Sequence, residues 1–190
     1  IDGGAGVDTV VFDFDRIDAT LDQIIEYKSK DGNVEIVRAW RIISGQHTDT
    51  IRNIERLKFK DSNVALDING NAGKIVKLLS ALLGADEAMN KAYIGIGLTS
   101  LDSGMSFESL MKAGLEFVLG SNPDSENVVN LFYENLVGSV APESIIKKYS
   151  ELIDLGELTP TDLGIAVAEH NITASNINLV GLVETGIEYI

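Results

Sequence analysis

The sequence predicts an α+β protein, in which a small β unit over residues 1–68 precedes an all-α domain of about six helices over residues 69–172. Before about residue 70, short runs of alternating apolar and polar residues lie between turn signals. After it, apolar residues recur at the three- and four-residue spacing of helices. The remaining residues, 173–190, are apolar with glycine breaks, and we expect them to form a separate C-terminal tail.

The β unit is predicted from strand-like runs that are bounded by turn residues. Asp31 and Gly32 separate the second run from the third, and both residue types accept positive φ, so a hairpin is expected there. The expected strands cover residues 9–12, 24–28, 34–40, 57–59 and 64–66.

The helices are predicted from apolar periodicity together with capping residues. Asn71 and Ser106 are expected N-caps, while Pro142 and Pro160 suit first-turn positions. Glycines follow several of the helices, as is usual where a helix ends. The expected helices cover residues 72–83, 86–98, 107–119, 126–137, 142–155 and 160–170.

A weak internal repeat runs through the helical region. Residues 78–84 resemble 131–138, and residues 101–104 resemble 153–156, at offsets of 52 to 54. The features keep the same order in both halves. We therefore expect two copies of a three-helix unit.

Composition excludes several classes of function. The formal net charge of −14 argues against a nucleic-acid partner, which would require a basic patch. Without cysteine there are no disulfides and no thiolate metal sites. No apolar run reaches the length of a transmembrane helix. The chain begins at Ile1, inside a motif and without a signal peptide, so we expect it to be part of a longer protein.

One motif carries recognisable chemistry. Residues 3–11 match G-G-x-G-x-D-x-U-x, the nonapeptide of the calcium-binding parallel β-roll. Calcium prefers six to eight hard oxygen ligands, which a glycine-rich turn supplies from its carbonyls and an aspartate from its carboxylate. A plain tight turn is the alternative. The expected calcium ligands are Asp2, Gly3, Ala5, Gly6 and Asp8.

This calcium site is expected to be half-formed. In a β-roll the ion lies between two turns, and the chain contains one complete repeat. We expect the second turn to lie before Ile1, with Asp13 and Asp15 as further candidate ligands. Val10 is expected to point into the core of the roll.

Other candidates have structural interpretations. Residues 67–71 resemble the start of an EF-hand loop but lack its sixth-position glycine and twelfth-position glutamate, so we interpret them as a turn and helix cap. His47 and His170 are interpreted as structural, and Trp40 as packing in the core. No nucleophile-elbow pattern, phosphate loop or zinc signature is present. No catalytic residue is expected.

Three segments together resemble known families. Residues 3–11 resemble the RTX, or haemolysin-type, calcium-binding repeat. Residues 53–61 resemble the N-x-E-R-L-x-F-x-D segment that often follows such repeats. Residues 67–73 and 103–108 resemble the helical DUF4214 domain, although Gly84-Ala85-Asp86 replaces its usual Pro-Asp step.

The resemblance implies a non-catalytic C-terminal module of a bacterial protein exported by a type I secretion system. It implies calcium-assisted folding outside the cell and an uncleaved tail that the exporter reads. The alternative is a cell-surface binding or assembly module, adhesin-like or S-layer-like, that holds a glycan or further copies of itself. Trp40 and the tyrosines are its candidate glycan contacts.

Overall fold

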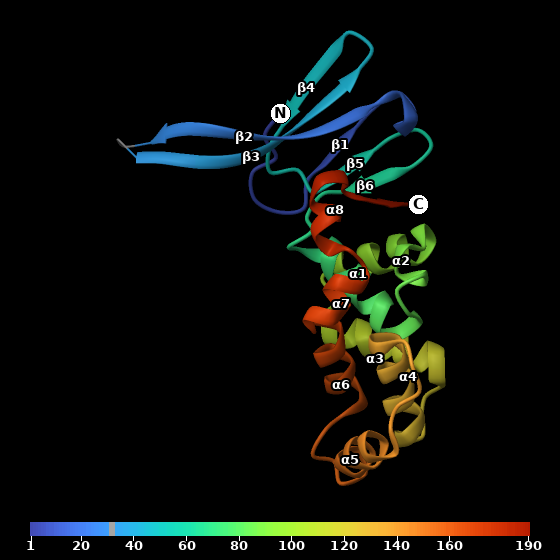
Figure 1. Cartoon of the computed structure of the whole chain (residues 1–190). Helices are drawn as coiled ribbons and strands as arrows, with labels where there is room; N and C mark the ends of the chain where they lie inside the picture. The colour runs from blue at the N-terminus through green and yellow to red at the C-terminus, as the bar shows by residue number, and fades with distance from the viewer. Residues whose placement is uncertain (31–32) are drawn as a thin grey trace. The chain divides into compact units, whose positions relative to one another are not determined.

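The computed structural model describes residues 1–30 and 33–190, and it confirms an α+β fold (Figure 1). The chain divides into two compact units. The β unit contains Ile1–Asp67 and Gly181–Ile190, and the helical unit contains Ile68–Val180.

The β unit contains two small sheets. In the first, β1 runs parallel to β5, and the other neighbouring strands are antiparallel. The second sheet is antiparallel throughout. The first sheet has the order β1 (Thr9–Val11), β5 (Arg56–Lys58), β6 (Asn63–Ala65), β7 (Ile187–Tyr189). The second has the order β2 (Thr20–Lys30), β3 (Asn33–Ser44), β4 (His47–Ile51), and a short 3-10 helix, η1 (Arg16–Asp18), precedes it.

The hairpin of β2 and β3 is longer than the sequence predicts. The antiparallel pairing extends along both strands, with Tyr27 opposite Ile36 and Gln23 opposite Trp40. The predicted turn at Asp31 and Gly32 lies outside the described residues.

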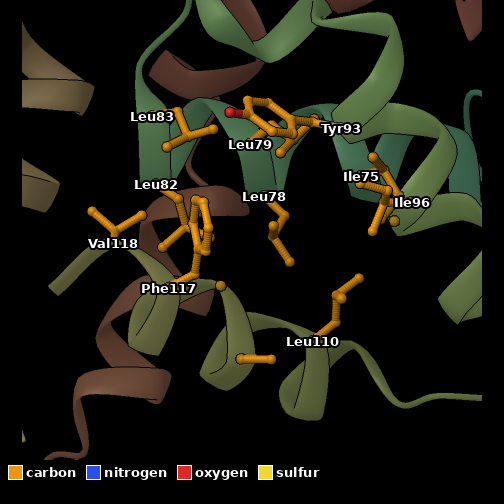
Figure 2. A pocket seen from close by; sticks show the side chains of 13 residues that line it. Ile75, Leu78, Leu79, Leu82, Leu83, Tyr93, Ile96, Leu110, Phe117 and Val118 are labelled. Atoms are coloured by element: carbon orange, nitrogen blue, oxygen red, sulfur yellow. The ribbon is translucent and has the colours of Figure 1, made fainter. Parts of the chain in front are cut away.

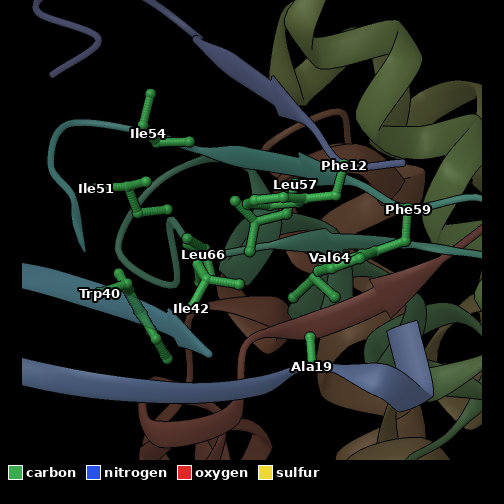
Figure 3. Packing of buried hydrophobic residues seen from close by; sticks show 10 residues of the cluster. All are labelled: Phe12, Ala19, Trp40, Ile42, Ile51, Ile54, Leu57, Phe59, Val64 and Leu66. Atoms are coloured by element: carbon green, nitrogen blue, oxygen red, sulfur yellow. The ribbon is translucent and has the colours of Figure 1, made fainter. Parts of the chain in front are cut away.

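Buried apolar side chains from both sheets form the core of the β unit (Figure 3). Phe12 and Phe59 stack with ring centroids 5.1 Å apart. Val10 packs against this core, as the motif predicts for its inward residue. Trp40 is also part of it and is only 8% exposed. The expectation that Trp40 packs in the core is confirmed.

The described residues contain more helices than expected, eight α-helices rather than about six. They are α1 (Asn71–Leu83), α2 (Lys91–Asp102), α3 (Phe107–Leu119), α4 (Ser125–Val137), α5 (Glu143–Asp154), α6 (Pro160–Ala168), α7 (Asn171–Asn176) and α8 (Leu179–Thr185), with the 3-10 helix η2 (Glu87–Met89) before α2. Two short helices, α7 and α8, follow the six that the sequence predicts, and most of α8 belongs to the β unit.

The first six helices pair at the offsets that the internal repeat predicts. Helices α1 and α4 each have 13 residues, and α2 and α5 each have 12. A hydrogen bond between side chains also recurs in both units. The Asn71 amide donates to the Asp102 carboxylate at 2.8 Å, and the Ser125 hydroxyl donates to the Asp154 carboxylate at 2.5 Å. Each hydrogen bond joins the first residue of the first helix of a unit to the last residue of its second helix.

Capping agrees with prediction at some helices and not at others. The Ser106 hydroxyl accepts from the Ser109 N–H, as expected. Asn71 is not an N-cap, because α1 begins at Asn71 itself and its amide bonds Asp102 instead. Helix α2 begins at Lys91 rather than near residue 86, because Asn90 accepts from two following N–H groups.

The C-terminal residues do not form a separate tail. Residues 187–189 form β7, which pairs with β6 and completes the first sheet, and Ile187 is fully buried. The preceding residues form α7 and α8. No helix in the described ranges has the length and apolarity needed to cross a bilayer.

Candidate calcium site

The glycine-rich loop lies against a later segment of the chain. The Gly3 N–H donates to the Arg52 carbonyl, and the Arg52 N–H donates to the Ile1 carbonyl, both at 3.0 Å. A Cβ atom on Gly3 would lie 2.2 Å from the Asn53 carbonyl oxygen. The first glycine of the motif is therefore required by close backbone approach.

The other two glycines set the shape of the turn. Gly4 has φ of 88° and Gly6 has φ of 123°, a region that favours glycine. Ala5 and Val7 are exposed beside them. The loop can therefore turn its backbone sharply before Asp8 without steric strain.

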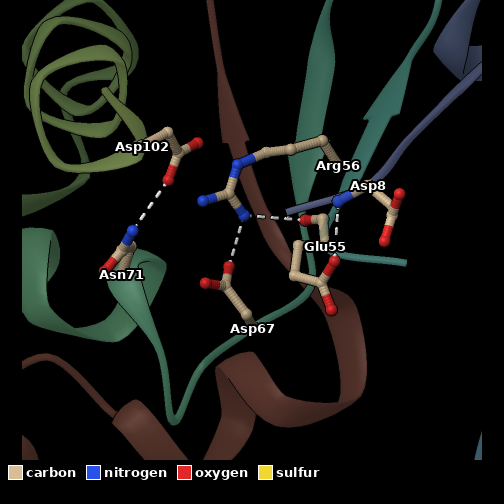
Figure 4. Close-up of polar contacts among 6 residues, drawn as sticks. All are labelled: Asp8, Glu55, Arg56, Asp67, Asn71 and Asp102. Atoms are coloured by element: carbon tan, nitrogen blue, oxygen red, sulfur yellow. Dashed lines mark hydrogen bonds and ion pairs between the residues drawn. The ribbon is translucent and has the colours of Figure 1, made fainter. Parts of the chain in front are cut away.

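The main chain of Asp8 forms hydrogen bonds with Glu55 and Arg56 (Figure 4). Its N–H donates to a Glu55 carboxylate oxygen at 2.9 Å. Its carbonyl accepts from the N–H groups of Glu55, at 3.2 Å, and Arg56, at 3.0 Å. The Oδ2 atom of Asp8 is shielded from water and accepts no hydrogen bond. A shielded carboxylate oxygen without a partner is unfavourable unless a cation or a water occupies the space beside it.

The register of β1 and β5 makes Glu55 the counterpart of Asp8. Thr9 lies beside Arg56, so the two acidic residues precede paired strands at the same level. The pattern acid-x-apolar-x-Phe occurs in both segments, 8–12 and 55–59. Sequence reasoning treated the second segment only as part of a resemblance, and alignment of the two would have identified Glu55.

The neighbouring turn comes from a place in the chain that was not predicted. The structure places Arg52–Glu55, about fifty residues later, beside the loop. The intervening residues form η1 and the second sheet. The motif alone could not predict this pairing, because the whole hairpin separates the two segments in the sequence. The second turn expected before Ile1 stays a prediction.

The remaining predicted ligands lie in different surroundings. The Asp2 carboxylate accepts from the Asn53 amide at 2.7 Å, within the same pair of turns. Asp13 pairs with Lys60 at 3.0 Å, and its side chain is 98% exposed. Asp15 is exposed at the start of η1. The structure therefore brings Asp2 and Asp8 to the two turns, while Asp13 is held in an exposed ion pair.

Arg56 anchors the second turn from the interior. It is 3% exposed, forms an ion pair with Asp67 and donates to the Glu55 carbonyl at 2.8 Å. Asp67, interpreted as part of a turn and helix cap, is the partner of a buried guanidinium. This arrangement fixes the backbone of Glu55, and with it the position of the carboxylate that accepts from Asp8.

The donor set suits calcium in kind. The Asp8 carboxylate and the neighbouring Glu55 carboxylate are hard oxygen donors, and the carbonyls of Gly3, Ala5 and Gly6 are of the same class. Among residues 1–30 and 33–190, no three side chains of His, Cys, Asp or Glu converge on one point. Main-chain carbonyls and water would therefore have to supply most of the coordination.

The two histidines lie outside this site. His47 is exposed on β4. His170 accepts from the Ile172 N–H at 3.2 Å and caps α7. The expected helix over residues 160–170 would place His170 at its end, whereas in the structure α6 ends at Ala168 and His170 lies at the start of α7.

Comparison of the chain with protein-family models, with curated proteins and with solved structures finds no match.

Proposed function

We propose that the chain is a non-catalytic module whose β unit is stabilised by calcium outside the cell. The observation that carries this is the Asp8 Oδ2 atom, shielded and without a partner, beside a glycine-rich turn that matches the calcium nonapeptide. Asp8 and Glu55 would hold the ion together with carbonyls of the loop. The ion would supply positive charge that links two turns of the chain.

The physical mechanism is linkage between binding and folding. An ion that binds only the folded unit stabilises it by RT ln(1 + [Ca²⁺]/Kd), about 1.4 kcal/mol at tenfold excess over Kd. Extracellular calcium modules bind at about 10⁻⁴ to 10⁻³ M. The β unit would thus gain stability after export, where calcium is plentiful, and remain less stable in the cytosol.

Melting followed by Trp40 fluorescence tests the proposal, because Trp40 is the one tryptophan and lies in the core of the β unit. Millimolar calcium should raise the midpoint by about 5 °C. Asp8→Asn should abolish the rise. Asp13→Asn, at an exposed carboxylate, should retain it. An equal rise in Asp8→Asn would contradict the proposed site.

We further propose that residues 173–190 act as the export signal before the chain folds. Strand β7 and its pairing with β6 form only in the folded chain. The segment is therefore accessible to an exporter only while the β unit is unfolded. Fusion of residues 173–190 to a reporter, in cells that carry a type I exporter, should give secretion. Retention of that fusion in the cytosol would contradict the role.

A second candidate, self-assembly at a cell surface, is favoured by an apolar stripe on the hairpin. Ile25, Tyr27, Val34 and Ile36 share one face and are 59 to 72% exposed. Trp40 lies further along the same face and is buried. Arg38, which is exposed and lies opposite Ile25, separates the stripe from Trp40 on this face.

Sedimentation at increasing concentration tests this candidate. A second copy on the stripe should give a dimer that Tyr27→Lys dissociates. Ile17→Lys is a matched control, because Ile17 is 86% exposed and lies outside the hairpin. A monomer at every concentration, or equal effects of both variants, would exclude assembly through this face.

A further inference from the structure

The helical unit contains a cavity whose lining is almost entirely hydrocarbon (Figure 2). It has a volume of about 280 Å³ and lies between α1, α2 and α3. The Tyr93 hydroxyl is the one polar side-chain group in its wall. The other lining residues are Ile75, Leu78, Leu79, Leu82, Leu83, Ile96, Gly97, Leu110, Ala113, Gly114, Phe117 and Val118.

Two glycines in the wall set the spacing of the helices around the cavity. A Cβ atom on Gly97 would lie 2.6 Å from Ile75, and one on Gly114 would lie 2.4 Å from Leu82. Both α2 and α3 therefore approach α1 closely at these positions. The cavity lies beside the close contacts, where the larger side chains separate the helices.

Large apolar side chains stand exposed at this cavity. Phe117 is 76% exposed and Ile96 is 65% exposed, while Tyr93 is 36% exposed. Together with the hollow they make a continuous apolar area that is open to solvent. Such areas on soluble proteins usually mark binding sites.

The second repeat contains an equivalent cavity with a different lining. It measures about 290 Å³ and lies between α4, α5 and α6. Leu110 and Ala113 correspond to Leu163 and Ala166 at an offset of 53 residues. Between α2 and α5, whose offset is 52, Tyr93 corresponds to Ile145 and Gly97 to Tyr149, and at the offset of 53 Phe117 corresponds to His170.

The presence of a cavity is therefore a consequence of the three-helix fold, whereas the apolar lining is a property of the first cavity. The three-helix arrangement leaves a hollow in both repeats, but the second is lined by Tyr133, Tyr149 and His170. Covering their polar groups with hydrocarbon would be unfavourable unless each kept a hydrogen bond. The first cavity imposes almost no such penalty.

We propose that the first cavity binds the alkyl chain of an amphiphile without negative charge. A cavity of 150 Å³ lined by apolar residues accommodates benzene, so 280 Å³ suits a chain of about ten carbons. Fourteen acidic and six basic residues lie between 68 and 180, which disfavours an anionic head group. The head group would lie outside the cavity, near Tyr93 and Phe117.

Titration of the full chain, labelled with ¹³C at Ile and Leu methyl groups, tests the proposal in calcium-free buffer. The probes are decyl glucoside, decyltrimethylammonium and decanoate, each below its micelle concentration. We expect the first two to shift the methyl signals of Ile75, Ile96 and Leu110 but not those of Ile145 and Leu163. Decanoate should bind at least several-fold more weakly.

Two variants at equivalent positions provide the control. Ala113→Phe fills the first cavity and should weaken binding more than tenfold, whereas Ala166→Phe fills the second and should leave binding unchanged. If Ala113→Phe does not fold, as judged by circular dichroism, Phe117→Ser at an exposed position replaces it and should weaken binding several-fold.

Several outcomes would overturn the proposal. These are the absence of shifts at millimolar probe, equal shifts at both cavities, binding that survives the cavity-filling variant, or tightest binding by decanoate. A dimer that Phe117→Ser dissociates would show that a second copy of the chain covers this area instead. None of these outcomes depends on calcium, so this proposal and the proposed calcium site can fail separately.

Discussion

Arg56 illustrates how a charged side chain in the interior can determine the geometry of an exposed turn. Its guanidinium is buried, pairs with Asp67 and binds the main chain at Glu55. Removing one partner of a buried ion pair leaves a charge without compensation, which typically costs about 3 kcal/mol or more. Arg56 therefore stabilises the fold and also positions the turn that contacts Asp8.

A double-mutant cycle should reveal this coupling. Arg56→Met and Asp67→Asn should each lower the free energy of unfolding of the β unit by about 3 kcal/mol. The double variant should lose less than the sum by about 1 kcal/mol or more, because neither charge remains unpaired. Urea denaturation followed by Trp40 fluorescence measures all three. Additive losses would show that the two side chains act independently.

Gly3 is predicted to be the least replaceable residue of the loop. Alanine there would place its Cβ against the Asn53 carbonyl, so the two turns would have to separate, at about 1–3 kcal/mol or more. Gly4→Ala is a matched control, because its Cβ would meet no atom within 4 Å and only the positive φ is unfavourable, by about 1–2 kcal/mol. Urea denaturation should place Gly3→Ala below Gly4→Ala in stability. The reverse order would argue against close contact between the two turns.

Among the elements, β7 has the largest consequence for the fold. It brings the last residues of the chain into the first sheet beside β6. Its pairing partner lies more than 120 residues away, so no local pattern could predict the pairing. The apolar alternation of the last residues was compatible with a strand, but it did not indicate which sheet that strand would join.

Substitution of the two terminal isoleucines tests the role of β7. Ile187 is fully buried and Ile190 is 66% exposed. Ile187→Ala should lower the free energy of unfolding of the β unit by about 2–4 kcal/mol, since the change leaves a cavity. Ile190→Ala should change it by less than about 0.5 kcal/mol. Equal, small effects in the Trp40 transition would mean that the C-terminal residues are not part of the β unit.

Local signals predicted most elements. Ser106, Thr159 and Pro160 mark helix starts through side-chain and ring geometry that acts within one turn, and α3 and α6 begin where these residues place them. The strands β1, β5 and β6 follow short apolar runs in the same way. Strand β4 was missed, because the run His47–Ile51 contains a single apolar residue and is recruited by its pairing with β3.

The candidate site was only partly predictable for the same reason. The spacing of Gly3, Gly6 and Asp8 identifies the turn and its chemistry from nine consecutive residues. Glu55 lies at this site only because β1 and β5 are parallel neighbours in the first sheet, although the residues of the second sheet separate them in the sequence. Parallel pairing requires a long connection, so its register cannot be read from either segment alone.

At the scale of the whole molecule, the net charge and the pairing of the last strand both bear on the proposal that calcium stabilises the β unit. The net charge of −14 opposes compaction through self-repulsion, which a bound divalent cation reduces. The β unit needs the last strand of the chain to complete its first sheet. We therefore expect the unit to fold only after the whole chain is available, and to be most stable where calcium is abundant.

Calorimetric titration of calcium into the full metal-free chain is the most direct test of the central claim. The account predicts one site per chain with a dissociation constant of about 10⁻⁴ to 10⁻³ M. It also predicts that heat of binding is lost in Asp8→Asn, reduced in Glu55→Gln and retained in Asp13→Asn. A folded chain that shows no heat with calcium, or the same heat in Asp8→Asn as in the unchanged protein, would contradict it.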